Sequence, residues 1–130
     1  MYKRQAVLER LRVLDREQQA VRFLSRGLQQ RVSIARALVH APRLVLLDEP
    51  YTGLDEVGAL AFTDALRELK AGGATLVLVT HNLVEGIALA TRAVIMRQGT
   101  FVHDEPTPTG GFDLAEFQGR YRALVHEGLA

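Results

Sequence analysis

Two short apolar runs, each ending abruptly in polar residues, constrain this chain most. Leu44–Leu47 is followed by Asp48-Glu49-Pro50, and Leu76–Val79 is followed by Thr80-His81. Short, wholly apolar runs of this kind are typical of strands that are buried on both faces. Helical patterns alternate with these runs, which predicts an α/β fold with a parallel sheet. The functional residues of such a sheet lie at the carboxyl ends of its strands.

The rest of the chain supports this prediction. Apolar residues recur at helical spacing in several segments, and Ser25 is a good N-cap for the second of them. We expect helices over residues 2–14, 25–41, 56–70, 83–90 and 113–127, and strands over residues 44–47, 75–80 and 93–96. A turn at Gln98-Gly99 predicts that residues 100–103 pair antiparallel with the third strand.

Composition limits the class of protein. The chain has 130 residues, of which 48% are apolar and 24% are charged, which is ordinary for one globular domain or part of one. Its apolar runs fall far short of the roughly 20 residues that a membrane-spanning helix needs. Cysteine is absent, which excludes disulfides, thiol nucleophiles and thiolate metal sites.

The charge is distributed unevenly. Residues 1–36 carry nine basic and three acidic residues, a net charge of +6, so the remainder carries −5 of the overall +1. A basic segment can meet nucleic acid or an anionic surface, but solvated helix surface is the more common reason for it. The only aromatic residues of the segment are Tyr2 and Phe23, so we expect no specific nucleic-acid binding.

The carboxyl ends of the two predicted strands place reactive polar side chains close together. Neighbouring strands lie about 4.8 Å apart, so the carboxyl ends of two parallel strands place Asp48, Glu49 and His81 within reach of one ligand. Phosphoryl transfer would use such groups: Asp48 in a magnesium shell, Glu49 on the attacking water and His81 on the transferred phosphoryl group. The alternative is that Asp48 and Glu49 merely end a strand and cap a loop.

Five motifs then occur in a fixed order between residues 24 and 81. They are Leu24-Ser25-Arg26-Gly27-Leu28-Gln29-Gln30-Arg31, Ile34-Ala35-Arg36-Ala37-Leu38, Leu44-Val45-Leu46-Leu47-Asp48-Glu49-Pro50, Thr52-Gly53-Leu54-Asp55 and Val79-Thr80-His81. In order and spacing this set resembles the ATP-binding cassette (ABC) ATPases. The resemblance implies binding of ATP and Mg²⁺ and hydrolysis coupled to transport.

The resemblance also implies roles for individual residues. Asp48 corresponds to the magnesium-shell acid, Glu49 to the catalytic carboxylate, Asp55 to the D-loop residue and His81 to the switch histidine. Each of these assignments follows from the position of the residue in its motif.

The signature loop corresponds to Ser25 and Gly27, which would contact nucleotide held by an opposing ATPase subunit. A Ser hydroxyl, a Gly amide and a helix N-terminus all favour an anion. Arg26 replaces a Gly of the usual pattern and either helps to bind the triphosphate or points to solvent. Leu28 replaces a Gln, and a core position is expected for it.

A cassette that binds its own ATP needs a G-x-x-x-x-G-K-[ST] loop. The chain has only two lysines, Lys3 and Lys70, and neither lies in such a motif. We therefore expect a partial P-loop NTPase (RecA-like) fold that lacks the phosphate-loop strand, begins in mid-domain and does not hydrolyse ATP alone. A naturally truncated, non-catalytic half-cassette that acts as a binding or dimerisation module is the alternative. Unpaired sheet edges would then favour self-association.

The resemblance divides the chain into residues 1–42, the end of a helical subdomain with the signature helix, residues 43–105, part of the α/β core, and residues 106–130, a hinge and helix. It implies a cytoplasmic location at the inner face of the membrane, through a membrane-spanning transporter subunit. Within the family, the motifs are similar to those of the haem-export ATPase of cytochrome c maturation and of multidrug-type relatives. Substrate and direction of transport stay open.

Overall fold

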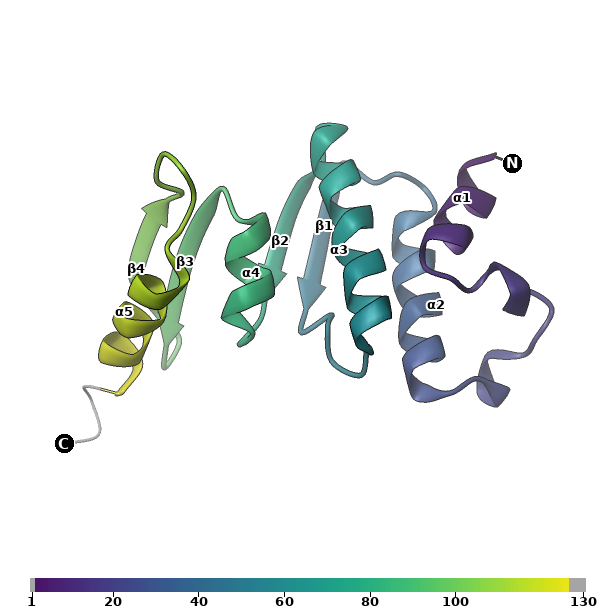
Figure 1. Ribbon diagram of the computed structural model, residues 1–130, viewed down its shortest axis with the longest axis horizontal. Coiled ribbons are helices and arrows are strands. Elements are labelled where there is room, and N and C mark those ends of the chain that lie inside the picture. The colour runs from purple at the N-terminus through teal and green to yellow at the C-terminus, as the bar shows by residue number, and fades with distance from the viewer. Residues whose placement is uncertain (1, 127–130) are drawn as a thin grey trace. The chain divides into compact units, whose positions relative to one another are not determined.

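The computed structural model describes residues 2–126, and the chain divides into two compact units, Met1–Thr80 and His81–Ala130. The first unit contains three helices, two 3₁₀ turns and two strands (Figure 1). In chain order these are α1 (Tyr2–Arg10), η1 (Leu14–Arg16), η2 (Val21–Phe23), α2 (Arg26–Leu38), β1 (Leu44–Asp48), α3 (Glu56–Ala71) and β2 (Thr75–Val79).

The two strands of this unit pair in parallel, as the sequence predicts. Leu44 lies opposite Thr75, and Asp48 lies opposite Val79, with no shift of register between them. α3 connects the two strands, which makes the segment a β-α-β unit. The α/β fold class is thus confirmed, and both carboxyl ends lie at one edge of the sheet.

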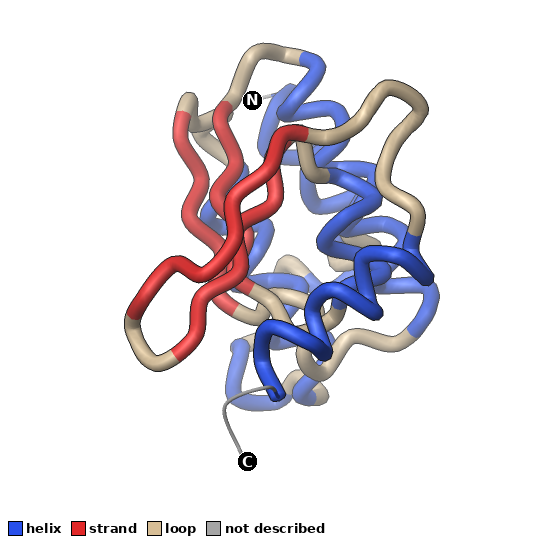
Figure 2. The backbone as a smooth tube through the Cα atoms, turned by 90° about the vertical axis from the view of Figure 1, so that its left-hand side faces the viewer, coloured by secondary structure: helices blue, strands red, loops and turns tan. Residues whose placement is uncertain are grey.

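The prediction that these strands are buried on both faces is wrong for one face. Val45 and Leu47 are buried, whereas Leu46 between them is 72% exposed, and Val77 opposite it is also exposed. The helices of the unit lie on one side of the strands (Figure 2), so alternate side chains reach the core and the others do not. An apolar run thus predicts a strand, but it does not show whether one or both faces of that strand are buried.

The core of the first unit lies between the helices and the inner face of β1. α1, α2 and α3 contact one another, and Phe62 and Leu66 on α3 are almost completely buried. α1 ends four residues earlier than predicted, because Arg12 adopts a left-handed φ of 55° and turns the chain. Leu11 and Val13 on either side of this turn are buried, so the turn itself is a core element.

The second unit contains α4 (Leu83–Leu89), β3 (Arg92–Arg97), β4 (Thr100–Pro106) and α5 (Leu114–His126). β3 and β4 pair antiparallel, which confirms the predicted hairpin, and Gln98 and Gly99 at its turn both have positive φ. Phe117 on α5 is buried and packs edge-on against Phe112, with ring centroids 5.2 Å apart. The last residue of the predicted helix, Glu127, lies outside the described residues.

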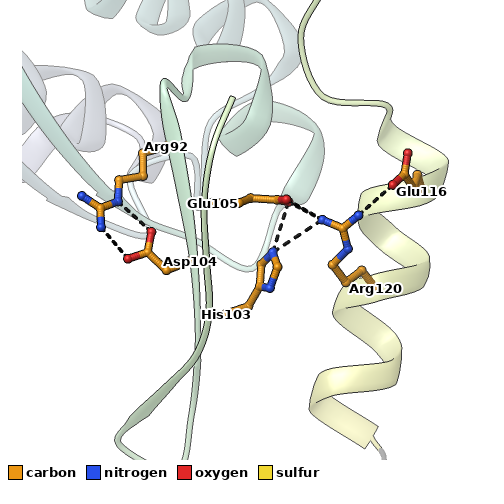
Figure 3. A network of polar contacts seen from close by, with 6 residues as sticks. All are labelled: Arg92, His103, Asp104, Glu105, Glu116 and Arg120. Atoms are coloured by element: carbon orange, nitrogen blue, oxygen red, sulfur yellow. Dashed lines mark hydrogen bonds and ion pairs between the residues drawn. The ribbon is translucent and has the colours of Figure 1, made fainter. Parts of the chain in front are cut away.

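A polar network joins α5 to the hairpin (Figure 3). Arg120 donates from Nη1 to both carboxylate oxygens of Glu105 at 2.6 Å and from Nη2 to Glu116 Oε1 at 2.7 Å. His103 Nε2 lies 3.2 Å from Glu105 Oε1. Burial raises the pKa of Glu105, but the hydrogen bonds from His103 and Arg120 outweigh it, and the pKa lies below its ordinary value.

Across residues 2–126, none of the helices is both long and apolar enough to cross a lipid bilayer.

Candidate functional site

The acidic pair lies where β1 leaves the sheet. Asp48 is the last residue of the strand and its side chain is exposed. Glu49 follows with a left-handed φ of 45°, and its amide donates to the Val79 carbonyl of β2 at 2.8 Å. Thr80 donates from Oγ1 to Glu49 Oε2 at 3.2 Å. The end of β2 therefore holds both the backbone and the side chain of Glu49.

The residues of the predicted signature loop lie at the N-terminus of α2. Ser25 is the N-cap, with extended backbone angles, and its Oγ accepts a hydrogen bond from the Leu28 amide at 3.3 Å. This bond uses a lone pair of Oγ and not the hydroxyl hydrogen, which can still be donated to a ligand. Ser25 is exposed, so the helix N-terminus and the hydroxyl both face solvent.

Two side chains shape the surroundings of Ser25. Gln29 donates from Nε2 to the carbonyls of Val21 at 3.2 Å and Leu24 at 3.0 Å, which fixes the turn before the helix. Arg26 is exposed and runs beside Gly53, where a Cβ added to the glycine would lie 4.0 Å from its Cγ and Nε. The exposed position of Arg26 agrees both with a contact to the triphosphate and with a side chain that points to solvent. Leu28, for which a core position was expected, is partly buried.

The loop of residues 49–55 is anchored to α3 by an aromatic side chain. The Tyr51 hydroxyl lies 2.8 Å from Thr63 Oγ1, and both residues are buried. The Tyr51 ring packs edge-on against Phe62, with centroids 5.1 Å apart. A buried hydroxyl needs a hydrogen-bond partner, so these two contacts together hold Tyr51, and the loop that carries it, against α3.

Asp55 ends that loop as the N-cap of α3. Its Oδ1 accepts from the Gly58 amide at 2.9 Å and from the Arg31 guanidinium of α2. The hydrogen bond from Gly58, followed by that from Arg31, holds the pKa of Asp55 below its ordinary value. Asp55 is therefore a carboxylate at neutral pH and is charged at the position that the D-loop assignment gives it.

The first unit contains six of the predicted site residues, namely Ser25, Arg26, Gly27, Asp48, Glu49 and Asp55. Gly27 lies against the loop, since a Cβ there would lie 3.0 Å from the Gly53 carbonyl oxygen. His81 is exposed and is the first residue of the second unit. Across residues 2–126, no three His, Cys, Asp or Glu side chains are grouped in a way that could hold a metal ion.

Sequence reasoning missed the residues that hold this site in place. Gln30 donates from Nε2 to the Pro50 carbonyl at 3.2 Å, and Arg31 pairs with Asp55. These partners are 20 and 24 residues apart, and no spacing rule links them. The sequence signal for them is weak: three consecutive polar residues, Gln29, Gln30 and Arg31, follow Leu28 on a helix whose next turn is mostly apolar.

The comparisons with known proteins agree with this geometry. The family model described as ABC transporter matches residues 2–52. An aliphatic sulfonates import ATP-binding protein of Albidiferax ferrireducens is 43% identical over 100 residues, which are 76% of this chain and 36% of that protein. The protein of the same description from Mycobacterium avium is 45% identical over 111 residues, covering 82% of this chain and 44% of the relative.

A solved structure of the ATP-binding subunit of an ABC transporter has the same fold, with a TM-score of 0.77 and 26% identity. It covers 98% of this chain, and the chain covers 51% of it. The chain thus spans about a third to a half of the length of these proteins. The relatives do not support the haem-export or multidrug subfamily. By sequence and by fold, the chain is similar to the ATP-binding cassettes of ABC transporters.

Proposed function

We propose that this chain supplies the signature loop, the magnesium-shell acid, the water-activating carboxylate and the switch histidine of an ATP-driven transporter. One observation carries the proposal. Asp48 and Glu49 leave β1 beside the end of β2, where the Val79 carbonyl and the Thr80 hydroxyl hold Glu49. Acidic residues at the carboxyl ends of parallel strands are the usual position for ligand chemistry in such sheets.

The donor set fits Mg²⁺. Magnesium prefers oxygen ligands and is commonly held by one or two carboxylates together with water and substrate phosphates, so no protein cage is needed. Asp48 is exposed and would be the residue that holds it. When bound, the ion neutralises charge on the phosphates of the nucleotide.

Glu49 is proposed to orient the attacking water and accept its proton. The Thr80 hydroxyl donates to Oε2 of Glu49, which holds the carboxylate in one direction. A general base must lie within hydrogen-bond reach of the proton it accepts, and a fixed carboxylate satisfies this at little entropic cost. His81 would contact the transferred phosphoryl group, as its motif implies.

Ser25 and Gly27 are proposed to contact nucleotide held by a second ATPase subunit. The exposed N-terminus of α2 presents a hydroxyl and backbone amides on one surface. Such a terminus attracts anions, and Arg26 beside it adds a permanent positive charge. The chain by itself is proposed not to hydrolyse ATP, because its sequence contains no G-x-x-x-x-G-K-[ST] motif to grip the triphosphate.

A membrane-spanning subunit is the proposed partner, which would place the chain at the cytoplasmic face of the membrane. The relatives are described as aliphatic sulfonates import proteins, so we propose import and an alkanesulfonate-type substrate for the transporter. A non-catalytic half-cassette is the second candidate, and the missing motif favours it over independent hydrolysis.

Complementation in trans tests the proposal. A full-length sulfonate-import cassette whose own signature Ser is replaced by Arg keeps its phosphate loop but cannot complete a site. We expect added chain to raise its ATP hydrolysis, and Ser25→Arg in the chain to abolish the gain. Ser33→Arg, an exposed position about two turns further along α2, is the matched control and should keep it. Equal rates with and without chain would refute the proposal.

A further inference from the structure

The N-terminal half of α2 is fastened to the loop of residues 49–55 at three places. The Arg31 guanidinium pairs with Asp55, and Gln30 Nε2 donates to the Pro50 carbonyl at 3.2 Å. Gly27 lies so close to Gly53 that a Cβ there would be 3.0 Å from the carbonyl oxygen. The contacts span the whole loop, from its second residue to its last.

The contact between Arg31 and Asp55 differs from a surface ion pair in the burial of its cation. The Arg31 side chain is only 11% exposed, although that of Asp55 is 65% exposed, whereas the pair Arg67–Asp64 on α3 leaves both side chains more than half exposed. Arg31 Nε is buried and is without a hydrogen-bond partner among the described residues. A cation that is buried to this extent is costly without its counter-charge, so the pair resists separation.

Gly58 makes room for this contact. A Cβ at residue 58 would lie 2.7 Å from Arg31 Nε and 2.7 Å from Asp55 Oδ1, closer than real Cβ atoms approach other atoms. Gly58 is also the residue whose amide Asp55 caps. The guanidinium therefore crosses the first turn of α3 at the one residue type that leaves space for it.

We propose that Arg31 is a positioning residue that locks the signature helix to the Asp55 loop, so that both reach a partner's nucleotide as one rigid piece. This inference rests on the proposed function, because only a site shared with a second subunit would require the signature helix and the Asp55 loop to keep a fixed arrangement. Arg31 itself does not touch nucleotide. It acts through Ser25 and Gly27 at one end and through Asp55 at the other.

The first test uses the chain alone and measures amide hydrogen exchange. Arg31→Gln should speed exchange about tenfold or more in both residues 49–55 and the first turn of α2, relative to the amides of β1, which report global unfolding. Arg31→Lys keeps the charge and should restore part of the protection. Arg67→Gln breaks the exposed pair and should change neither segment. Faster exchange in only one of the two segments would overturn the lock.

The second test uses the complementation assay. Arg31→Gln should lower the maximal stimulated rate about tenfold, with less than a twofold change in the ATP concentration that gives half of it, because misplacement costs rate and not nucleotide affinity. Loosened segments with a wild-type rate would overturn the positioning role and leave the proposed function intact. A wild-type chain that stimulates nothing would overturn the proposed function and this role with it, while the exchange result would still decide whether the lock exists.

Discussion

Leu46 and Leu47 are neighbours of the same residue type on the same strand, yet they face opposite sides of the sheet. Leu47 is 9% exposed and faces the helices, whereas Leu46 is 72% exposed. Replacing either with Ala removes the same atoms and changes strand propensity equally. The difference between the two variants therefore measures burial alone.

The magnitudes follow from these fractions. Leu→Ala at a buried core position costs about 2–5 kcal/mol of unfolding free energy. Full burial of a Leu side chain contributes about 1.5–3 kcal/mol, so the 28% of Leu46 that is covered corresponds to roughly 0.4–0.8 kcal/mol. We expect Leu47→Ala to cost at least about 1 kcal/mol more than Leu46→Ala.

Urea unfolding of the 130-residue chain is the assay. With a slope of about 1–3 kcal/mol/M for a small protein, the midpoint of Leu47→Ala should lie lower than that of Leu46→Ala by about 0.3 M or more. Equal slopes for the two variants would show that the change lies in stability. If Leu46→Ala lowered the midpoint as much as Leu47→Ala, the outer face of the sheet would be covered in solution, and the reasoning from its exposure would be refuted.

Three further predictions concern polar contacts. Tyr51→Phe removes the buried hydrogen bond to Thr63 and should lower the unfolding free energy by about 1–3 kcal/mol, since it leaves a buried hydroxyl unpaired; an unchanged urea midpoint would contradict this. The hydrogen bond from Arg92, together with the charge of Arg92, holds the pKa of Asp104 below its ordinary value of 3.8. The ion pair therefore stabilises the fold above pH 3.8, and this stabilisation is lost as the pH falls through the pKa of Asp104 in the folded state. Arg92→Gln should therefore be less stable than wild type at neutral pH, and the gap should close in acid; a gap independent of pH would refute the assignment. In a cassette that carries its own phosphate loop, the change that corresponds to Glu49→Gln should nearly abolish turnover but leave ATP binding intact, as filter binding and phosphate release would show, and retained turnover would exclude Glu49 as the water-activating group.

Local chemistry made much of the fold predictable. Ser25 was predicted as an N-cap by residue type, and a helix begins directly after it. The Gln98-Gly99 turn predicted the antiparallel hairpin because Gly adopts the positive φ that such turns require at no steric cost. The parallel pairing of β1 with β2 followed from a helix of ordinary length between two apolar runs.

Burial and long-range contact were not predictable in the same way. The run Leu44–Leu47 has no alternation that could show which face is covered, so it predicts two-sided burial, whereas the strand is buried on one side. The ties from Gln30 and Arg31 to the loop of residues 49–55 join segments 20 and 24 residues apart, and no local rule indicates them.

The sequence alone predicted which residues would carry chemistry here, because capping groups, apolar runs and the order of the motifs are properties of short segments. Only the tertiary structure decided which side of the sheet is covered, that Thr80 holds Glu49, and that Arg31 joins the signature helix to Asp55. The physical reason is that burial and ion pairing depend on which surfaces meet, and this is settled when α2, α3 and the two strands pack together.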